Sequence, residues 1–288
     1  MPIRLARPSD LDTAARIFAA GFYDEEVLGH LLHPYRQQYP EDFVRYWKWS
    51  CRKRYWDYAR VLVVSYVEKV DEGGRKHETL TGVAAWNRMG PGWMKVWGIW
   101  GWWDPSKHTP FLRVRRTWRK EETDDFHRID TILTRIGLFI QKFVNLLDKI
   151  SGIIWPNRAA SKNPVLSPSN FYKVVARFVL PFYANPPQRS TTWDLSTLAV
   201  RPEYRELGHG RELVAWGIER AKQEKVLASV IAAEGRERFY ARCGFTNIVG
   251  WATEGEGNPL KANGVVGGAV MFTPSVHTEV KENKGNIE

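Results

Sequence analysis

The chain has 288 residues, of which 43% are apolar and 26% charged, and its net charge is +10. This balance excludes wholesale disorder, and the excess of basic residues favours an anionic partner. The two cysteines, Cys51 and Cys243, exclude a disulfide framework and a zinc site built from cysteines alone. No apolar stretch approaches about 20 residues, and the N-terminus has no apolar signal region. We therefore expect a cytoplasmic protein without a membrane span, with a nuclear location as the alternative.

Periodicity and turn residues divide both ends of the chain into short elements. In the first part we expect a strand at 3–7, a helix from Ser9 to Gly21, two helices within 24–58, and a hairpin of strands 61–67 and 80–86. In the last part we expect a strand at 193–200, a helix at 211–224, a strand at 226–232, a helix at 234–242, and strands at 248–252 and 269–272.

The middle of the chain has a different character. Five of the 14 Trp residues lie between Trp93 and Trp103, and residues 101–190 hold 15 Lys or Arg against 7 Asp or Glu. Apolar residues at helical spacing predict a helix at about 125–150, and a shorter helix is expected at 171–182. The region is either a helical cap with a solvated basic face and a Trp core, or the wall of an acceptor pocket with the Trp residues as its apolar floor.

A strand, a turn with glycines and a helix follow one another from Leu198 onward. Gly208 and Gly210 would leave backbone N–H groups uncovered at the helix N-terminus, whose partial positive charge attracts anions such as a pyrophosphate. A simple strand–helix connector is the alternative, because this pattern alone is weak. No Gly-Lys-Ser/Thr follows, which excludes a Walker loop, and Leu213 stands where the six-residue dinucleotide motif requires glycine.

Two segments together resemble the GNAT superfamily of acetyl-CoA-dependent N-acyltransferases. Residues 205–210, Arg-Glu-Leu-Gly-His-Gly, are similar to the family's (Gln/Arg)-x-x-Gly-x-(Gly/Ala) loop. Residues 239–245, Phe-Tyr-Ala-Arg-Cys-Gly-Phe, are similar to its Phe-Tyr-x-x-x-Gly-Phe helix end, and residues 3–10 resemble its first strand and helix.

The resemblance implies an α/β (α+β) fold with a mixed, mostly antiparallel central sheet flanked by helices. It implies a single GNAT-like domain over residues 1–274, with its core at 1–90 and 191–274. Residues at about 91–190 then form a mainly helical, Trp-rich insertion between the third and fourth strands, and 275–288 form a disordered tail.

The resemblance also implies acetyl-CoA as the acyl donor and assigns residues to it. Backbone groups of Leu198, Ala199 and Val200 would pair with the pantetheine arm. The pyrophosphate would be held by the turn and the start of the helix, that is by Arg205, Glu206, Leu207, Gly208, His209, Gly210 and Arg211.

Two residues are expected to carry the chemistry. Tyr240 matches the tyrosine that protonates the departing thiolate in many members, and a phenol stays protonated at neutral pH. Its alternative role is an aromatic packed beside Phe239 and Phe245. Asp194 resembles the carboxylate base of the histone-acetylating members, which is needed because an ammonium cannot attack a thioester. It could act directly or through a water, and its alternative role is an outward-facing residue on a strand edge.

Three further residues are expected to contact the acceptor. Asp24 and Glu25 follow the first helix, where this fold usually places substrate contacts, although they could simply form the acidic first turn of the next helix. Trp86 ends the third expected strand. The sequence suggests no metal site, and Cys243 lacks a recognisable His partner that would make it a nucleophile.

We therefore expect transfer of an acetyl group from acetyl-CoA to the amine of a small-molecule acceptor, bulky or aromatic if the Trp residues wall its pocket, by direct attack in a ternary complex. A catalytically silent acyl-CoA-binding module and a protein or peptide N-acetyltransferase are the alternatives. Nucleic-acid binding is disfavoured because no recognisable motif for it occurs. Membrane-surface attachment of the 125–150 helix is disfavoured by the acids Asp130 and Asp148 on its polar face.

Overall fold

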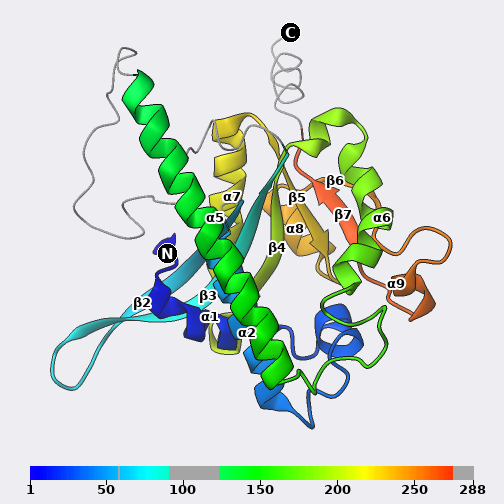
Figure 1. Cartoon of the computed structure of the whole chain (residues 1–288), viewed down its shortest axis with the longest axis horizontal. Helices are drawn as coiled ribbons and strands as arrows, with labels where there is room; N and C mark the ends of the chain where they lie inside the picture. The colour runs from blue at the N-terminus through cyan, green and yellow to red at the C-terminus, as the bar shows by residue number, and fades with distance from the viewer. Residues whose placement is uncertain (58, 91–122, 275–288) are drawn as a thin grey trace.

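The structure is a computed structural model. It describes residues 1–57, 59–90 and 123–274, and the side chains of its longest helix from residue 139 onward. The Trp-rich segment at 93–103, expected as the floor of an acceptor pocket, and the tail at 275–288, expected to be disordered, lie outside the described residues. Figure 1 shows a twisted sheet with helices on both sides.

Within the described residues, seven strands form one sheet in the order β1-β2-β3-β4-β5-β7-β6. Neighbouring strands are antiparallel except β4 and β5, which are parallel. The strands are β1 (Ile3–Leu5), β2 (Arg60–Val70), β3 (Lys76–Met89), β4 (Thr192–Val200), β5 (Leu227–Ala232), β6 (Asn247–Trp251) and β7 (Ala269–Phe272). The mixed, mostly antiparallel α/β fold expected from the sequence is thus confirmed.

Helices connect these strands. The α-helices are α1 (Leu11–Gly21), α2 (Pro40–Tyr55), α5 (Thr123–Ile154), α6 (Phe171–Ala184), α7 (His209–Glu224), α8 (Glu237–Cys243) and α9 (Pro259–Ala262). Short 3-10 helices lie at η1 (Pro8–Asp10), η4 (Pro187–Ser190) and η5 (Pro202–Tyr204), and a π-helix, η2, spans Glu26–Leu31. The two helices expected within 24–58 correspond to η2 and α2.

The two faces of the sheet bury separate cores. On one face, α7 packs on a cluster that includes Trp86, Trp193 and Leu213. On the other face, α1 and α2 enclose a cluster around Phe18 and Trp47, and α6 contributes to a third cluster. Alternate residues of the central strands supply the two faces, as the pleat of a strand requires.

The parallel pair β4–β5 is joined over only part of its length. Its register begins with Thr192 opposite Leu227 and ends with Leu195 opposite Val230, although β4 continues to Val200. Beyond Leu195 the two strands separate, so the end of β4 is paired on its β3 side only. An open strand edge therefore lies in the middle of the sheet.

A β-bulge marks the point of separation. Ala85 of β3 lies opposite Thr197, but the next residue, Trp86, lies opposite Leu195, so Ser196 is an extra residue in β4. A bulge bends its strand and increases the local twist. The bend contributes to turning the end of β4 away from β5.

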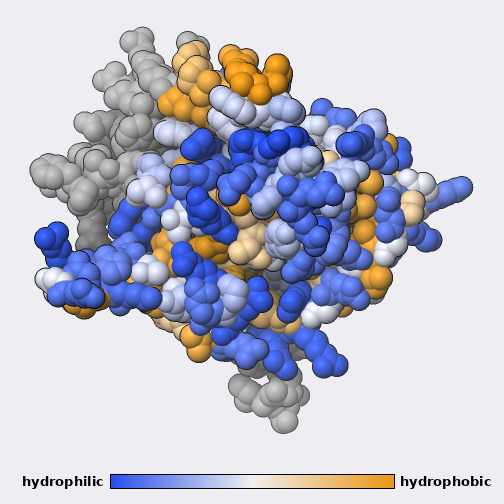
Figure 2. All heavy atoms as spheres, turned by 90° about the horizontal axis from the view of Figure 1, so that it is seen from below, coloured by the Kyte–Doolittle hydropathy of each residue, from blue (hydrophilic) through white to orange (hydrophobic). Residues whose placement is uncertain are grey.

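The chain between β3 and β4 contains α5 and α6. The described part of α5 is fixed to α2, because Trp49 Nε1 donates to Ser151 Oγ at 3.0 Å and Lys53 pairs with Asp148 at 2.8 Å. Phe139 of α5 remains 68% exposed, and Figure 2 shows hydrophobic patches on a mainly hydrophilic face of the molecule. No helix of the described chain is long and apolar enough to cross a membrane.

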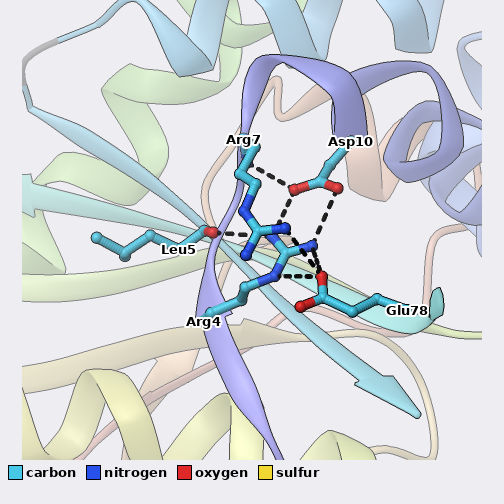
Figure 3. Close-up of polar contacts among 5 residues, drawn as sticks. All are labelled: Arg4, Leu5, Arg7, Asp10 and Glu78. Carbon is cyan, nitrogen blue, oxygen red and sulfur yellow. Dashed lines mark hydrogen bonds and ion pairs between the residues drawn. The ribbon is translucent and has the colours of Figure 1, made fainter. Parts of the chain in front are cut away.

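Polar contacts fix the short strand β1 at the edge of the sheet (Figure 3). The guanidinium of Arg4 pairs with Asp10 and with Glu78 of β3, both at 2.6 Å. Asp10 also accepts a hydrogen bond from the backbone N–H of Arg7 at 2.6 Å. The start of α1 is thereby tied to the β2–β3 hairpin.

Candidate functional site

A cavity of about 1660 Å³ opens where β4 and β5 separate. Its walls come from the end of α1, from α2, α6 and α8, from β4 and β5, and from the first turn of α7. Residues that are far apart in the sequence therefore line one cavity. The lining includes residues that were expected to bind the donor and both residues that were expected to carry the chemistry.

The open edge of β4 forms one wall. Leu198, Ala199 and Val200 all line the cavity. Their strand lacks a described partner on this side, so an extended molecule could add to it by hydrogen bonds of the kind that join two strands. The expected pantetheine position is compatible with this geometry.

The turn before α7 forms the next wall. Gly208 has φ +89° and Glu206 has φ 64°, so both residues lie in the left-handed region. Glycine adopts this conformation without steric cost, which explains its presence at position 208. The bond from Glu212 N to Gly208 O, at 3.1 Å, opens the helix. The N–H groups of residues 209–211 precede it and have no acceptor within the helix, which makes this end suited to an anion.

Most of the residues expected to bind the donor line the cavity, but two do not. The turn residues that line it are Arg205, Glu206, Gly208, Gly210 and Arg211. Leu207 is 55% exposed and is not part of the lining. His209 is buried instead, with Nδ1 2.9 Å from Thr81 Oγ1, so its side chain anchors α7 to the sheet. The side chain of His209 is therefore not available to a ligand in the cavity.

Asp194 lies on β4 just before the bulge, half-buried and lining the cavity. Its Oδ1 accepts hydrogen bonds from Tyr183 Oη at 2.9 Å and from Ser229 Oγ at 2.8 Å. Burial raises the pKa of this carboxyl above its ordinary value, while the two hydrogen bonds oppose the shift. Among the described residues nothing donates to Oδ2, which leaves one oxygen free to accept a proton.

Tyr240 approaches the cavity from α8. Its ring lies edge-on to Phe239 at 5.0 Å and to Phe245 at 6.0 Å, and the residue is half-buried. Burial raises the pKa of its phenol above the ordinary value, so the group is firmly protonated at neutral pH. In the described chain its hydroxyl has no hydrogen-bond partner. The packing role and the proton-donor role therefore coexist in one residue.

The three residues expected at the acceptor lie in different environments. Asp24 lines the cavity with an 85% exposed side chain. Glu25 also lines it, but its carboxylate caps η2 by accepting from the N–H groups of Val27 and Leu28. Trp86 differs from the expectation: it is fully buried, donates Nε1–H to Leu213 O at 3.2 Å, and is not part of the lining. Its place is in the core beneath α7.

The sequence did not single out three residues that line this cavity, nor Ser229, which donates to Asp194 but is not part of the lining. Tyr183 and Ser229 hold Asp194, while Arg54 and Arg60 bring positive charge from the end of α2 and the start of β2. No motif marks them, because they come together only through the fold. Among the described residues no group of three or more His, Cys, Asp or Glu side chains could hold a metal ion.

Comparisons with solved structures find several distant matches. An acetyltransferase from Corynebacterium glutamicum, described as histone acetyltransferase HPA2 and related acetyltransferase, is 14% identical with a TM-score of 0.47, over 95% of this chain and 96% of its own. The mosquito arylalkylamine N-acetyltransferase like 5b is 13% identical with a TM-score of 0.39, over 94% of this chain and 97% of its own. Tetrahymena GCN5 is 10% identical with a TM-score of 0.30, over 91% and 86%.

A comparison with curated protein sequences finds no match. The sequence model of the acetyltransferase (GNAT) family matches residues 173–245. This segment runs from α6 through β4, the turn, α7 and β5 to the end of α8, and so contains the open strand edge, Asp194 and Tyr240. Over this segment the chain is similar to the acetyltransferase (GNAT) family.

Proposed function

We propose that the protein transfers an acetyl group from acetyl-CoA to the amine of a small-molecule acceptor, directly and within a ternary complex. The family generally uses acetyl-CoA as its cosubstrate, and the fold supports acyl-CoA-dependent N-acetyl transfer. The observation that carries the proposal is the cavity at the β4–β5 separation, which the open strand edge, the α7 N-terminus, Asp194 and Tyr240 all line.

The donor fits one part of this cavity. Backbone groups of Leu198, Ala199 and Val200 are suited to the amides of a pantetheine arm, and the N–H groups at the start of α7 are suited to a pyrophosphate. Arg205 and Arg211 add positive charge at the same place. Bound there, acetyl-CoA would supply an activated acyl group.

Asp194 and Tyr240 provide the proton transfers that the reaction requires. The free Oδ2 of Asp194 takes a proton from the acceptor ammonium, directly or through a water. The neutral amine then forms the new N–C bond as the C–S bond breaks, and the second proton that the nitrogen loses on becoming an amide is released to water. Tyr240 gives its phenolic proton to the leaving thiolate, and its raised pKa keeps that proton available at neutral pH.

The helices α5 and α6 support a small acceptor, because Gln141, Asn145 and Tyr172 of these helices belong to the cavity wall. A peptide acceptor remains the alternative for the same machinery.

A catalytically silent module would bind acetyl-CoA without turnover. Release of free thiol from acetyl-CoA, measured across amines, amino acids and peptides, separates these cases: a raised melting temperature without any thiol release would indicate the silent module.

The role of Asp194 predicts a change in pH dependence. Wild-type kcat/KM should rise with pH through the raised pKa of this carboxyl. Asp194→Asn should lower the rate at neutral pH by about 100-fold and flatten the rise. Asp12→Asn, an exposed substitution on α1, is the matched control and should leave the profile unchanged. A wild-type profile in Asp194→Asn would show that another group is the base.

The role of Tyr240 predicts slower thiol release without loss of donor binding. Tyr240→Phe keeps the ring contacts with Phe239 and Phe245 but removes the proton, so kcat should fall by about 10-fold or more while the melting shift with acetyl-CoA persists. Tyr35→Phe, which lies outside this cavity, is the control. An unchanged kcat in Tyr240→Phe would leave the residue with a packing role only.

A further inference from the structure

Arg54, near the end of α2, is a buried cation that pairs with no carboxylate of the described residues. The residue is 6% exposed, and its guanidinium carbon lies 5.9 Å from the ring of Phe18 and 5.8 Å from the ring of Trp47. Its Nε and Nη1 are buried, and neither has a hydrogen-bond partner among the described residues. Among the described residues no carboxylate forms an ion pair with it.

A buried guanidinium without a paired anion destabilises the fold unless a bound ligand supplies the anion. A buried charge is normally paired and hydrogen-bonded, and an uncompensated one destabilises the fold. Contact with aromatic faces offsets only part of that cost. Arg54 lines the large cavity, so an anionic molecule bound there can pair with its guanidinium.

The neighbouring cations of the cavity differ from Arg54 in this respect. Lys53 is paired with Asp148 at 2.8 Å, and Arg60 is paired with Asp57 at 3.1 Å. Their charges are paired with carboxylates, whereas no carboxylate of the described residues pairs with Arg54. Arg54 is therefore the group of this part of the wall that is most in need of an anion.

The same wall connects Arg54 with the expected base. Arg60 lies on this wall as well; burial lowers the pKa of its guanidinium, the charge of Arg54 adds to the shift, and the charges of Asp57 and Asp194 oppose it. Tyr46 and Ser50 of α2 and Asn87 of β3 complete this polar side of the cavity. A molecule that reaches Asp194 with its amine can thus extend toward Arg54 with another group.

We propose that the acceptor carries an anionic group, a carboxylate or a phosphate, in addition to its amine, and that Arg54 binds this group while Asp194 faces the amine. The planar guanidinium is suited to both anions because it can donate two parallel hydrogen bonds. This inference rests on the proposed function for the identity of the amine as the reacting group. It narrows the acceptors from amines in general to amino acids and aminoalkyl phosphates or their relatives.

The test compares three series of increasing chain length: ω-amino carboxylates, ω-aminoalkyl phosphates and neutral alkylamines. Thiol release from acetyl-CoA gives kcat and KM for each, and melting temperatures without acetyl-CoA report binding alone. At least one anionic series should be preferred over the alkylamines of equal length, and the better series identifies the anion. In Arg54→Met the KM of the preferred acceptor should rise about 10-fold or more, with little change for alkylamines.

Two further variants make the result specific. Arg54→Lys keeps a charge and should restore part of the preference, and Arg16→Met, an exposed substitution on α1, should behave as the wild type. Equal use of neutral and anionic amines by the wild type, or a preference that survives Arg54→Met, would overturn the inference while leaving acetyl transfer intact. If no amine supports thiol release, the proposed function fails, and the melting data decide alone. A rise with an anionic amine that Arg54→Met abolishes supports the anion site, and no rise contradicts it.

Discussion

Burial at the level of single residues gives this protein a pH-sensitive stability. His33, between η2 and α2, is fully buried against the rings of Phe43 and Tyr46, and its Nδ1 lies 2.7 Å from Leu28 O. Burial lowers the pKa of His33 from 6.5 to about 4, with Arg36 adding to the shift. The neutral ring is therefore the form that the fold accepts.

This shift predicts acid destabilisation with a defined sign. Because the folded pKa lies below the unfolded value, the stabilisation is fully present above about pH 6.5 and is lost as pH falls toward 4. The free energy of unfolding should drop by on the order of 3 kcal/mol across that window. Denaturant unfolding at several pH values checks this, and in His33→Gln the slope between pH 6.5 and 4 should be smaller. An equal slope in both proteins would assign the acid sensitivity to other groups.

Close packing governs the contact between the element α7 and the sheet. A Cβ placed on Gly217 of α7 would lie 2.2 Å from the buried ring of Trp86. Glycine normally weakens a helix interior by about 1 kcal/mol relative to alanine. Here the glycine allows α7 to lie close to the ring of Trp86, because it has no side chain.

Two glycine substitutions therefore have opposite expected signs. Gly217→Ala should lower the free energy of unfolding by about 2 kcal/mol, because the added methyl overpacks the core. Gly152→Ala in α5, where nothing lies within 4 Å of the new Cβ, should raise it by about 0.5 kcal/mol or more. Thermal or denaturant unfolding of the two variants measures both effects. A stabilising Gly217→Ala would show that Trp86 can move aside.

The elements followed from local patterns more readily than their contacts did. The alternation and turn residues at 61–86 predicted the hairpin, and the glycines near residue 210 predicted the start of α7. Local pattern carries no information on neighbours, so it did not place β7 between β5 and β6. Trp86 was misplaced for the same reason: a strand residue near a site can point to either face, and packing against α7 decided.

At the scale of the whole molecule, the chain between β3 and β4 takes part in the site. Tyr183 of α6 donates to Asp194, and Ser229 of β5 donates to the same oxygen. Hydrogen bonds to the ionised form of a carboxyl favour that form. Helix α6, which lies between β3 and β4 in the sequence, thus helps to set the pKa of Asp194 on the central strand β4.

Tyr183→Phe should therefore shift the pH profile rather than abolish activity. With one hydrogen bond removed, the pKa of Asp194 should rise further, and the rise of kcat/KM should move to higher pH while its plateau remains within about 10-fold of wild type. Tyr35→Phe serves again as the control. An unmoved profile would mean that Ser229 alone determines the ionisation of Asp194.

The sequence predicted Asp194 and Tyr240 through motif resemblance, but Tyr183 and Arg54 depended on tertiary contacts that no motif records.

The β-bulge at Ser196 affects how the sequence of β4 can be aligned with the equivalent strands of other proteins. Strict alternation counted back from Val200 would put Asp194 on the same face as Leu198, but the extra residue places these two side chains on opposite faces. A relative without the bulge would keep the same geometry with one residue fewer between its carboxylate and its turn, so an ungapped alignment would pair Asp194 with the wrong position. Because Ser196 is the one extra residue of the bulge, removing it would straighten β4 and leave every other side chain on its present face. The activity of such a variant would report the effect of backbone curvature alone, since the catalytic groups would be unchanged.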